Sequence, residues 1–355
     1  MGLRVDTDIP HGNAADVEIL EDGEVTEVRF AADPHGGPEC LWFCFRLSSA
    51  DGWIGRVRLV MKHFPNILGN NEPANILPVV RPEGGDWERL EGGEKRILPD
   101  GRWWGVWNLT VDAPRAEVAV CYPYGRAELE ALIADTEGRL RSDTIGLTQG
   151  GRPLVRVSNG SGEAGSTRPG LYLIARQHSG ETPGSWVLDG MLRCFAGAGD
   201  QAPLVWSVPL SNTDGVEQGD YGKDNFPWDL NRAWGGPPMR HEVLVIQRDM
   251  LRWRERCRAA FGLDLHAPGA CEAEGLYAHM PDPDQFPGRF EKAKRLAAIL
   301  EEGLSDRYVA EPFAQVHHWR SRWNFPTFSM YCFESVGMPA LCVEVPYARA
   351  GEMVL

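Results

Sequence analysis

The stretch LYLIARQHSGETPGSW, residues 171–186, decides how the chain folds. It begins with five residues that suit a strand buried on both faces of a sheet. The polar residues 176–181 follow, and the pattern of residues 185–196 predicts an amphipathic helix. In an open α/β sheet, ligands bind at the carboxyl ends of the strands. The sequence therefore predicts that His178 and Glu181 lie at a ligand-binding edge.

Three further apolar runs end in polar residues in the same way. The residues that follow them are Asn212 and Asp214 after 204–208, His266 after 262–265, and Glu344 after 340–343. Because the carboxyl ends of such strands face one crevice, two histidines, two glutamates and an Asn/Asp pair are expected to converge there. Further helices are expected at about 126–134, 241–260 and 289–303.

Residues up to about 120 have a different pattern, in which apolar and polar residues alternate over short stretches. These stretches are residues 24–30, 41–47, 55–61, 103–109 and 116–122. Turn clusters rich in Gly, Pro, Asp and Asn separate them, which is typical of an antiparallel β-sandwich. The pattern changes at YPYG, residues 122–125. We therefore expect two domains, a β-sandwich at 1–122 and an α/β domain at 123–355.

The composition excludes several classes of function. The chain has 355 residues, 43% hydrophobic and 24% charged, as in a typical globular protein. Its net charge of −14 argues against a nucleic-acid partner, because such proteins usually present clustered basic side chains. No apolar run approaches the roughly 18 residues of a membrane helix, and residues 1–20 lack the apolar core of a secretory signal. The eight cysteines are scattered singly, which favours a reduced, cytoplasmic setting.

Two histidines and one glutamate at the strand ends form a candidate metal site. The pair His178 and Glu181 is weak alone, because an acidic residue also suits the start of a helix. A lone His266 would more often be a hydrogen-bonded structural residue. Together, two imidazoles and one carboxylate with a fourth position open to water form a recognised catalytic zinc set. Asp264 shares a strand face with His266, so it is either a core-edge residue or a partner that orients the site.

The order of these motifs resembles that of the zinc carboxypeptidase family, in its cytosolic branch. The matching motifs are HSGETPGSW at 178–186, NTDG at 212–215, DLNR at 229–232, DLH at 264–266 and VE at 343–344. The N-terminal part, with WFCF at 42–45 and YPY at 122–124, is also similar to that branch. The resemblance covers nearly the whole chain. It implies an α/β domain with a mixed sheet, preceded by the antiparallel sandwich.

The resemblance implies a role for each matching residue. The residues that would bind one zinc ion per chain are His178, Glu181 and His266. Glu344 would be the general base that acts on a zinc-activated water, and later the general acid. Asn231 and Arg232 would hold the terminal carboxylate of the substrate, for which the guanidinium fork is suited. The implied reaction removes the C-terminal residue, an acidic one included, from a peptide or protein.

Two features depart from the family pattern. The family places an arginine that polarises the scissile carbonyl ahead of the Asp-Leu-Asn-Arg motif, but here the matching stretch is GDYG, residues 219–222, followed by Lys223. Either Lys223 supplies the positive charge or the oxyanion is stabilised otherwise. The family also carries a tyrosine in a mobile loop, for which Tyr331 is one candidate, although core packing explains it as well.

Arg320 and Arg322 are candidates for a pocket for acidic side chains, although a surface loop explains them equally well.

Other functions stay open at this point. A related zinc amidohydrolase acting on N-acyl amino acids shares the His-x-x-Glu and distal histidine, but is usually built without a sandwich. A catalytically impaired relative that binds zinc or peptide is a second alternative, which the glycine at position 222 supports. A lectin acting through residues 1–120 is a more distant one. The sequence leaves the oligomeric state open, a homo-oligomer included.

Overall fold

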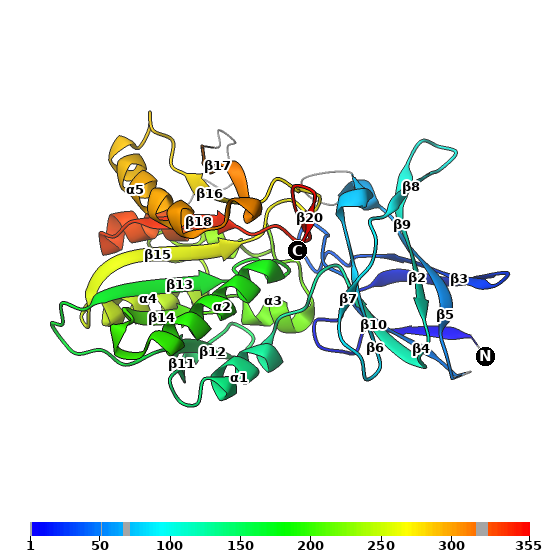
Figure 1. The fold of residues 1–355 in the computed structure, drawn as a ribbon, viewed down its shortest axis with the longest axis horizontal. Coiled ribbons are helices and arrows are strands. Elements are labelled where there is room, and N and C mark those ends of the chain that lie inside the picture. The colour runs from blue at the N-terminus through cyan, green and yellow to red at the C-terminus, as the bar shows by residue number, and fades with distance from the viewer. Residues whose placement is uncertain (1, 51, 67–71, 317–325) are drawn as a thin grey trace.

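The structure is a computed structural model that describes residues 2–50, 52–66, 72–316 and 326–355. Figure 1 shows two units side by side. The chain first builds a unit of strands, coloured blue and cyan, and then a unit in which helices pack around a long sheet, coloured green to red. The segment between β10 (Arg115–Ala119) and α1 (Arg126–Asp135) joins the two. The domain boundary after residue 122 falls in this segment and stays a proposal.

Two five-stranded sheets form the first unit. One has the order β1 (Leu3–Asp6), β4 (Cys44–Ser49), β10, β6 (Val79–Pro82) and β7 (Glu88–Arg89). The other has the order β2 (Ala15–Asp22), β3 (Val25–Ala31), β5 (Gly55–Met61), β9 (Trp103–Val111) and β8 (Glu94–Ile97). The described strand pairs are antiparallel, apart from β3 and β5, which run parallel.

Alternation along the strands explains why the two sheets pack face to face. On β5, Val57 and Leu59 are buried, whereas Arg56 before them is exposed and Arg58 between them is only half-buried, because successive side chains of a strand point to opposite faces. Phe30 of one sheet packs edge-to-face on Phe45 of the other, with ring centroids 5.0 Å apart. The predicted β-sandwich is thus present, with one parallel pair among its antiparallel pairs.

An eight-stranded sheet forms the second unit. Its strands, in spatial order, are β11 (Arg141–Leu147), β12 (Pro153–Ser158), β14 (Leu204–Val208), β13 (Pro169–Ala175), β15 (Arg258–His266), β18 (Ala340–Glu344), β16 (Leu276–Met280) and β17 (Val309–Val316). The four central strands are parallel, whereas β12 and β16 pair antiparallel with their inner neighbours. The sheet is therefore mixed, and the carboxyl ends of its central strands meet at one edge.

Helices cover both faces of this sheet. The α-helices after α1 are α2 (Thr182–Ala198), α3 (Thr213–Gln218), α4 (His241–Arg254), α5 (Pro287–Gly303) and α6 (Phe328–Tyr331). Single turns of other helix types lie at Phe64–Asn66, Pro73–Asn75, Gly199–Gln201, Leu230–Arg232 (η4), Asp306–Tyr308 and Cys332–Val336. Leu171 and Leu173 of β13 share a core with α1, α2 and α5, whereas Tyr172 and Ile174 share one with α4 and α6. The run at 171–175 is apolar on both faces because both faces are covered.

Two expected boundaries move further in the structure than the others. The helix expected at 241–260 ends at Arg254, and β15 begins at Arg258 rather than at residue 262. The reason is that Ala259 pairs with Gly170 and Phe261 with Leu171, so the start of β13 extends its neighbour. Tertiary pairing overrides local helical propensity here.

The two units share a core. Tyr221, Ala267 and Tyr347 of the second unit pack with the core of the sandwich. Asn13 Nδ2 donates to Gly219 O at 2.7 Å, and Arg89 Nη2 donates to Tyr347 O at 2.8 Å. The sandwich therefore contacts segments near the carboxyl ends of the central strands. These contacts hold the two units against each other.

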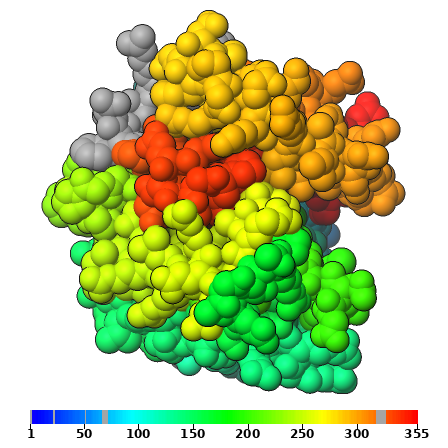
Figure 2. All heavy atoms as spheres, turned by 90° about the vertical axis from the view of Figure 1, so that its left-hand side faces the viewer, coloured from blue at the N-terminus to red at the C-terminus, as the bar shows by residue number. Residues whose placement is uncertain are grey.

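Figure 2 shows the end of the molecule away from the sandwich, where segments coloured green to red form the surface. A shallow pocket of about 350 Å³ opens between the start of α5 and the 332–336 turn, lined by residues that include Arg289, Phe333 and Glu334. None of the three candidate metal ligands lines it. Of the helices in the described part of the chain, none combines the length and apolar character that crossing a bilayer requires.

Candidate metal centre and active site

The turn after β13 brings His178 and Glu181 together. The Nδ1 atom of His178 is 2.8 Å from Oε1 of Glu181, and both side chains are buried. Glu181 precedes the first turn of α2, but its carboxylate makes no capping hydrogen bond to that helix. Its second oxygen, Oε2, lies 2.7 Å from Nδ1 of His266. Glu181 therefore faces two imidazoles, rather than serving as a helix cap.

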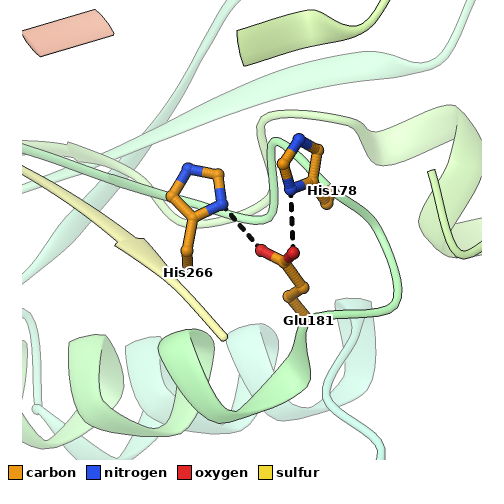
Figure 3. Close-up of side chains that lie close together, drawn as sticks. All are labelled: His178, Glu181 and His266. Atoms are coloured by element: carbon orange, nitrogen blue, oxygen red, sulfur yellow. Dashed lines mark hydrogen bonds and ion pairs between the residues drawn. The ribbon is translucent and has the colours of Figure 1, made fainter. Parts of the chain in front are cut away.

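His266 is the last residue of β15, which lies beside β13 in the sheet. Its ring centroid lies 4.7 Å from that of His178. Figure 3 shows the arrangement, with Glu181 at the start of α2 and its two carboxylate oxygens turned toward the two rings. The ligand atoms of His178, Glu181 and His266 all lie within 4.8 Å of one another. The structure thus brings the three predicted ligands together.

The outer nitrogen of each ring faces a second carboxylate. Nε2 of His178 is 3.2 Å from both carboxylate oxygens of Asp229, and Nε2 of His266 is 2.9 Å from Oδ2 of Asp264. Both aspartates are buried. Such a partner fixes the ring orientation and leaves Nδ1 for a metal. Of the two alternatives for Asp264, the geometry favours the one in which it orients the site.

The charges of this cluster fit a divalent cation. Burial alone would lower the pKa of His178, but the negative charges of Glu181 and Asp229 raise it to about 9. Burial would also lower the pKa of His266, but the negative charges of Asp264 and Glu181 raise it well above its usual value. Both rings are thus held as cations. Exchanging their two Nδ1 protons for one divalent ion leaves the total charge unchanged, so the cluster suits such an ion.

A buried arginine holds the turn that carries His178. Arg176 has a positive φ of 60°, which turns the chain sharply after β13. Its guanidinium donates to Ser179 O at 2.7 Å and to Tyr124 O at 2.6 Å. Burial lowers the pKa of Arg176 to about 10, so the side chain stays charged at neutral pH. Arg176 therefore fixes the metal-facing turn to the segment that precedes α1.

Glu344 is the last residue of β18 and pairs in register with His266 on the neighbouring parallel strand. Its Oε1 accepts a hydrogen bond from His279 Nε2 at 3.0 Å. Its Oε2 is buried and has no hydrogen-bond partner within the described ranges. Burial would raise the pKa of Glu344, but the hydrogen bond from His279 and the charges of His279 and His266 lower it. Glu344 is thus held as a carboxylate with one oxygen unpaired.

The charges of the same carboxylates act on Lys223. Burial alone would lower the pKa of Lys223, but the charges of Glu181, Glu344 and Glu39 raise it. The residue before it, Gly222, has a φ of +84°, and a side chain there would begin 2.6 Å from Ser179 N. The backbone therefore leaves no space for an arginine at position 222. The positive charge near the carboxylates belongs to the next residue along.

Asn231 and Arg232 both lie in η4 and are buried. The Asn231 amide is engaged, with Nδ2 at 3.1 Å from His266 Nε2 and Oδ1 accepting from Phe328 N at 3.1 Å. Arg232 donates to the carbonyl of Asn231 at 2.9 Å, and its charge helps to lower the pKa of Asp229. The structure thus places Asn231 beside His266, with Arg232 next to it along the chain.

Some of the residues expected at the edge have other roles. Asn212 caps α3 by accepting from Gly215 N at 3.2 Å, and Asp214 binds Arg152 at 2.8 Å. Asn212 and Asp214 therefore stabilise the loop that follows β14. Tyr331 packs on Trp234 with ring centroids 5.5 Å apart, so core packing accounts for it. The expected pocket arginines, Arg320 and Arg322, lie outside the described residues.

Sequence reasoning missed two residues of the site. His279 lies within a strand, so it is not one of the polar residues that follow an apolar run. Asp229 belongs to the Asp-Leu-Asn-Arg motif, but only the Asn and Arg received a role. Its signal was available, because a buried aspartate beside a metal-binding histidine commonly orients the ring.

Comparisons with known proteins agree with this fold. No protein-family model matches the chain. Mouse cytosolic carboxypeptidase 1 is 34% identical over 94 residues, which cover 24% of this chain and 8% of the relative. Mouse cytosolic carboxypeptidase 6 is 26% identical over 207 residues, which cover 54% of this chain and 38% of the relative. The matches therefore span less than half of the length of these relatives.

Solved structures match over nearly the whole chain. A metallo-carboxypeptidase from Burkholderia cenocepacia has a TM-score of 0.78 at 19% identity, covering 99% of this chain and 92% of that one. A metallo-carboxypeptidase from Pseudomonas aeruginosa, in complex with (2-guanidinoethylmercapto)succinic acid, has a TM-score of 0.73 at 19% identity, covering 98% and 91%. The chain has the fold of these proteins, sandwich included. The chain is thus similar in sequence to cytosolic carboxypeptidases over part of its length, and it shares the fold of solved metallo-carboxypeptidases.

Proposed function

We propose that the chain is a zinc-dependent carboxypeptidase that removes the C-terminal residue of a peptide or protein. The observation that carries this proposal is that His178, Glu181 and His266 converge while Glu344 lies on the strand next to His266. Two imidazoles and one carboxylate leave a fourth position of a tetrahedral ion open, as catalytic zinc sites do. One zinc ion per chain is the expected cofactor.

The residues around the site would divide the chemistry among them. When bound, zinc would lower the pKa of a coordinated water from 15.7 toward about 7. Oε2 of Glu344 would accept the proton of the attacking water and later pass it to the leaving amine. Asp229 and Asp264 would hold the rings of His178 and His266 with Nδ1 toward the metal.

Lys223 is the residue that we assign to the developing oxyanion. Burial opposes its charge, but the charges of Glu181 and Glu344 raise the pKa of its ammonium. Gly222, at the position of the family's arginine, lies against Ser179 and leaves no space for a long side chain. A positive charge at the scissile carbonyl stabilises the transition state, so the adjacent lysine would do the work of the missing arginine.

Arg232 is the residue that we assign to the carboxylate of the substrate. A guanidinium suits this role, because its fork donates two parallel hydrogen bonds. Asn231 was expected to share it. That role stays a prediction.

The substrate and its location follow from the relatives only as proposals. Some relatives are named cytosolic carboxypeptidases, which supports a cytoplasmic protein that acts on peptide or protein C-termini. A preference for acidic C-terminal residues stays a prediction. A nucleic-acid partner is not proposed, in view of the net charge of −14, and neither is a membrane partner.

Two alternatives are separated from this proposal by observation and experiment. A zinc amidohydrolase acting on N-acyl amino acids is disfavoured, because a full-length fold match includes the sandwich. An impaired relative that only binds zinc or peptide is supported by Gly222 and disfavoured by the charge of Lys223.

The experiment that tests the proposal combines metal analysis with a peptide screen. The purified protein is loaded with zinc, its metal content is measured, and peptides that differ only in their last residue are offered. One zinc ion per chain and release of single C-terminal amino acids would support the proposal. Zinc binding without release of any C-terminal residue would favour the impaired relative. Release of acyl groups from N-acyl amino acids alone would favour the amidohydrolase.

A further inference from the structure

We infer that His279 is a positioning residue, which holds one oxygen of Glu344 so that the other stays directed to the reaction. The inference rests on the proposed function of Glu344 as general base. His279 belongs to β16, the strand that pairs antiparallel with β18. His279 belongs to none of the sequence motifs from which the site was predicted.

The sheet geometry places His279 and Glu344 on one face. In the antiparallel pair, Tyr277 lies opposite Glu344, and His279 lies opposite Cys342. Opposed residues share a face, and so do residues two apart along a strand. His279 is thus the diagonal neighbour of Glu344, and its Nε2 reaches Oε1 at 3.0 Å. The two backbones fix this contact, since both residues lie within paired strands.

The contact makes the two oxygens of Glu344 unequal. Oε1 accepts from His279 and lies 3.7 Å from the Cys342 thiol, whereas Oε2 is buried and has no hydrogen-bond partner in the described part of the chain. A buried carboxylate oxygen without a partner is unfavourable, so its presence calls for an explanation. We explain it as the oxygen that receives the proton of the attacking water. Anchoring Oε1 stops the carboxylate from rotating to pair both oxygens elsewhere.

The contact also fixes the tautomer of His279. An ionised carboxylate can only accept hydrogen bonds, so Nε2 of His279 must carry a proton. This statement about a proton at a named atom can be measured without any turnover. It allows the contact to be tested separately from the activity.

The kinetic arm compares His279→Leu with His279→Gln, both loaded with zinc. Leucine removes the donor, whereas the glutamine amide can place an N–H near the position of Nε2. For His279→Leu, we expect kcat to fall by about 100-fold with KM within about twofold, because a misplaced catalytic group lowers the rate without weakening binding. His279→Gln should recover most of the loss. Zinc content should be unchanged in both, and His241→Leu, on an exposed histidine of α4, is the control.

The spectroscopic arm measures the ring tautomer of His279 by two-bond ¹H–¹⁵N NMR in the zinc-loaded protein and in Glu344→Gln. A protonated Nε2 whose signal shifts in Glu344→Gln supports the inference. An unprotonated Nε2, or a wild-type kcat in His279→Leu, overturns it while the proposed function stands. If the wild type releases no C-terminal residue but the expected tautomer and shift are found, the proposed function fails and the contact is still supported.

Discussion

His266 and Glu344 end neighbouring parallel strands at the same register position. One is a candidate metal ligand and the other the candidate general base. Because paired residues of a sheet point to the same face, the backbone alone keeps the base next to the metal-facing ring. Other groups of the site lie in turns, next to the ends of these two strands. The strand-end pair therefore defines where the reaction would take place.

Replacing Glu181 with alanine should abolish zinc binding. Each carboxylate oxygen of Glu181 faces one imidazole, so the alanine variant keeps only two of the three zinc ligands. The stabilisation that zinc gives against heat should therefore disappear. Zinc content and the melting temperature with and without zinc measure this. Glu302→Ala, on an exposed residue near the end of α5, should bind zinc as the wild type does. Full zinc occupancy in Glu181→Ala would place the metal elsewhere.

Replacing Lys223 with methionine should lower kcat by about 100-fold or more, which is the usual effect of losing one oxyanion donor. Lys223→Arg should keep more of the activity, because it keeps the charge. Gly222→Arg should not improve turnover and should destabilise the fold, since Ser179 occupies the space. Steady-state kinetics and thermal melts measure these effects. Wild-type turnover in Lys223→Met would return the oxyanion role to another group.

Replacing Arg176 with methionine should lower the free energy of unfolding by about 2–4 kcal/mol, because two buried carbonyls lose charged hydrogen bonds. Arg126→Met is the matched control, since its exposed ion pair with Glu130 should contribute less than about 0.5 kcal/mol. Urea unfolding of the zinc-loaded proteins measures both. Equal effects of the two substitutions would show that Arg176 does not hold the turn.

Glu27 should make the sandwich sensitive to acid. Its hydrogen bonds from Arg96, and then from Arg29, lower the pKa of Glu27 from 4.5 to about 2 against the effect of burial. Because the pKa is lower in the folded state, the stability that Glu27 supplies is complete above pH 4.5 and is lost as the pH falls toward 2. The difference in unfolding free energy between wild type and Glu27→Gln should therefore shrink with acidification below pH 4.5.

Urea unfolding between about pH 6 and pH 3 measures this difference across the range in which the carboxyl of the unfolded chain titrates. Glu24→Gln is the control, because Glu24 is exposed in its contact with Arg56. A difference for Glu27→Gln that stays constant with pH would show that the arginine cluster does not lower its pKa.

Much of the site could be predicted because its residues follow buried strands. His178, His266 and Glu344 stand where apolar runs end, and a parallel sheet gathers such ends at one edge. The local pattern could not show how the residues behind them divide their roles. Asn212 stands at a strand end too, yet it caps α3, because capping depends on the three residues that follow it.

Other features depended on partners that a single stretch of sequence does not reveal. His279 acts through β18, which lies more than sixty residues further along the chain, and the antiparallel pairing of β16 with it is not visible in the local pattern. The start of β15 is set by its pairing with β13. The local pattern, which does not show this pairing, therefore predicts that the preceding helix continues to residue 260. Short edge strands such as β7, with two residues, carry too little alternation to be detected.

Glu344→Gln is the substitution that decides whether Glu344 is the general base of a zinc hydrolase. Glutamine keeps the shape of the side chain but cannot accept the proton, so kcat on a C-terminal peptide substrate should fall by about 100- to 10,000-fold. Zinc content and melting temperature should match the wild type, because Glu344 is not among the three converging ligands. A zinc-loaded Glu344→Gln that turns over at the wild-type rate would show that Glu344 is not the general base.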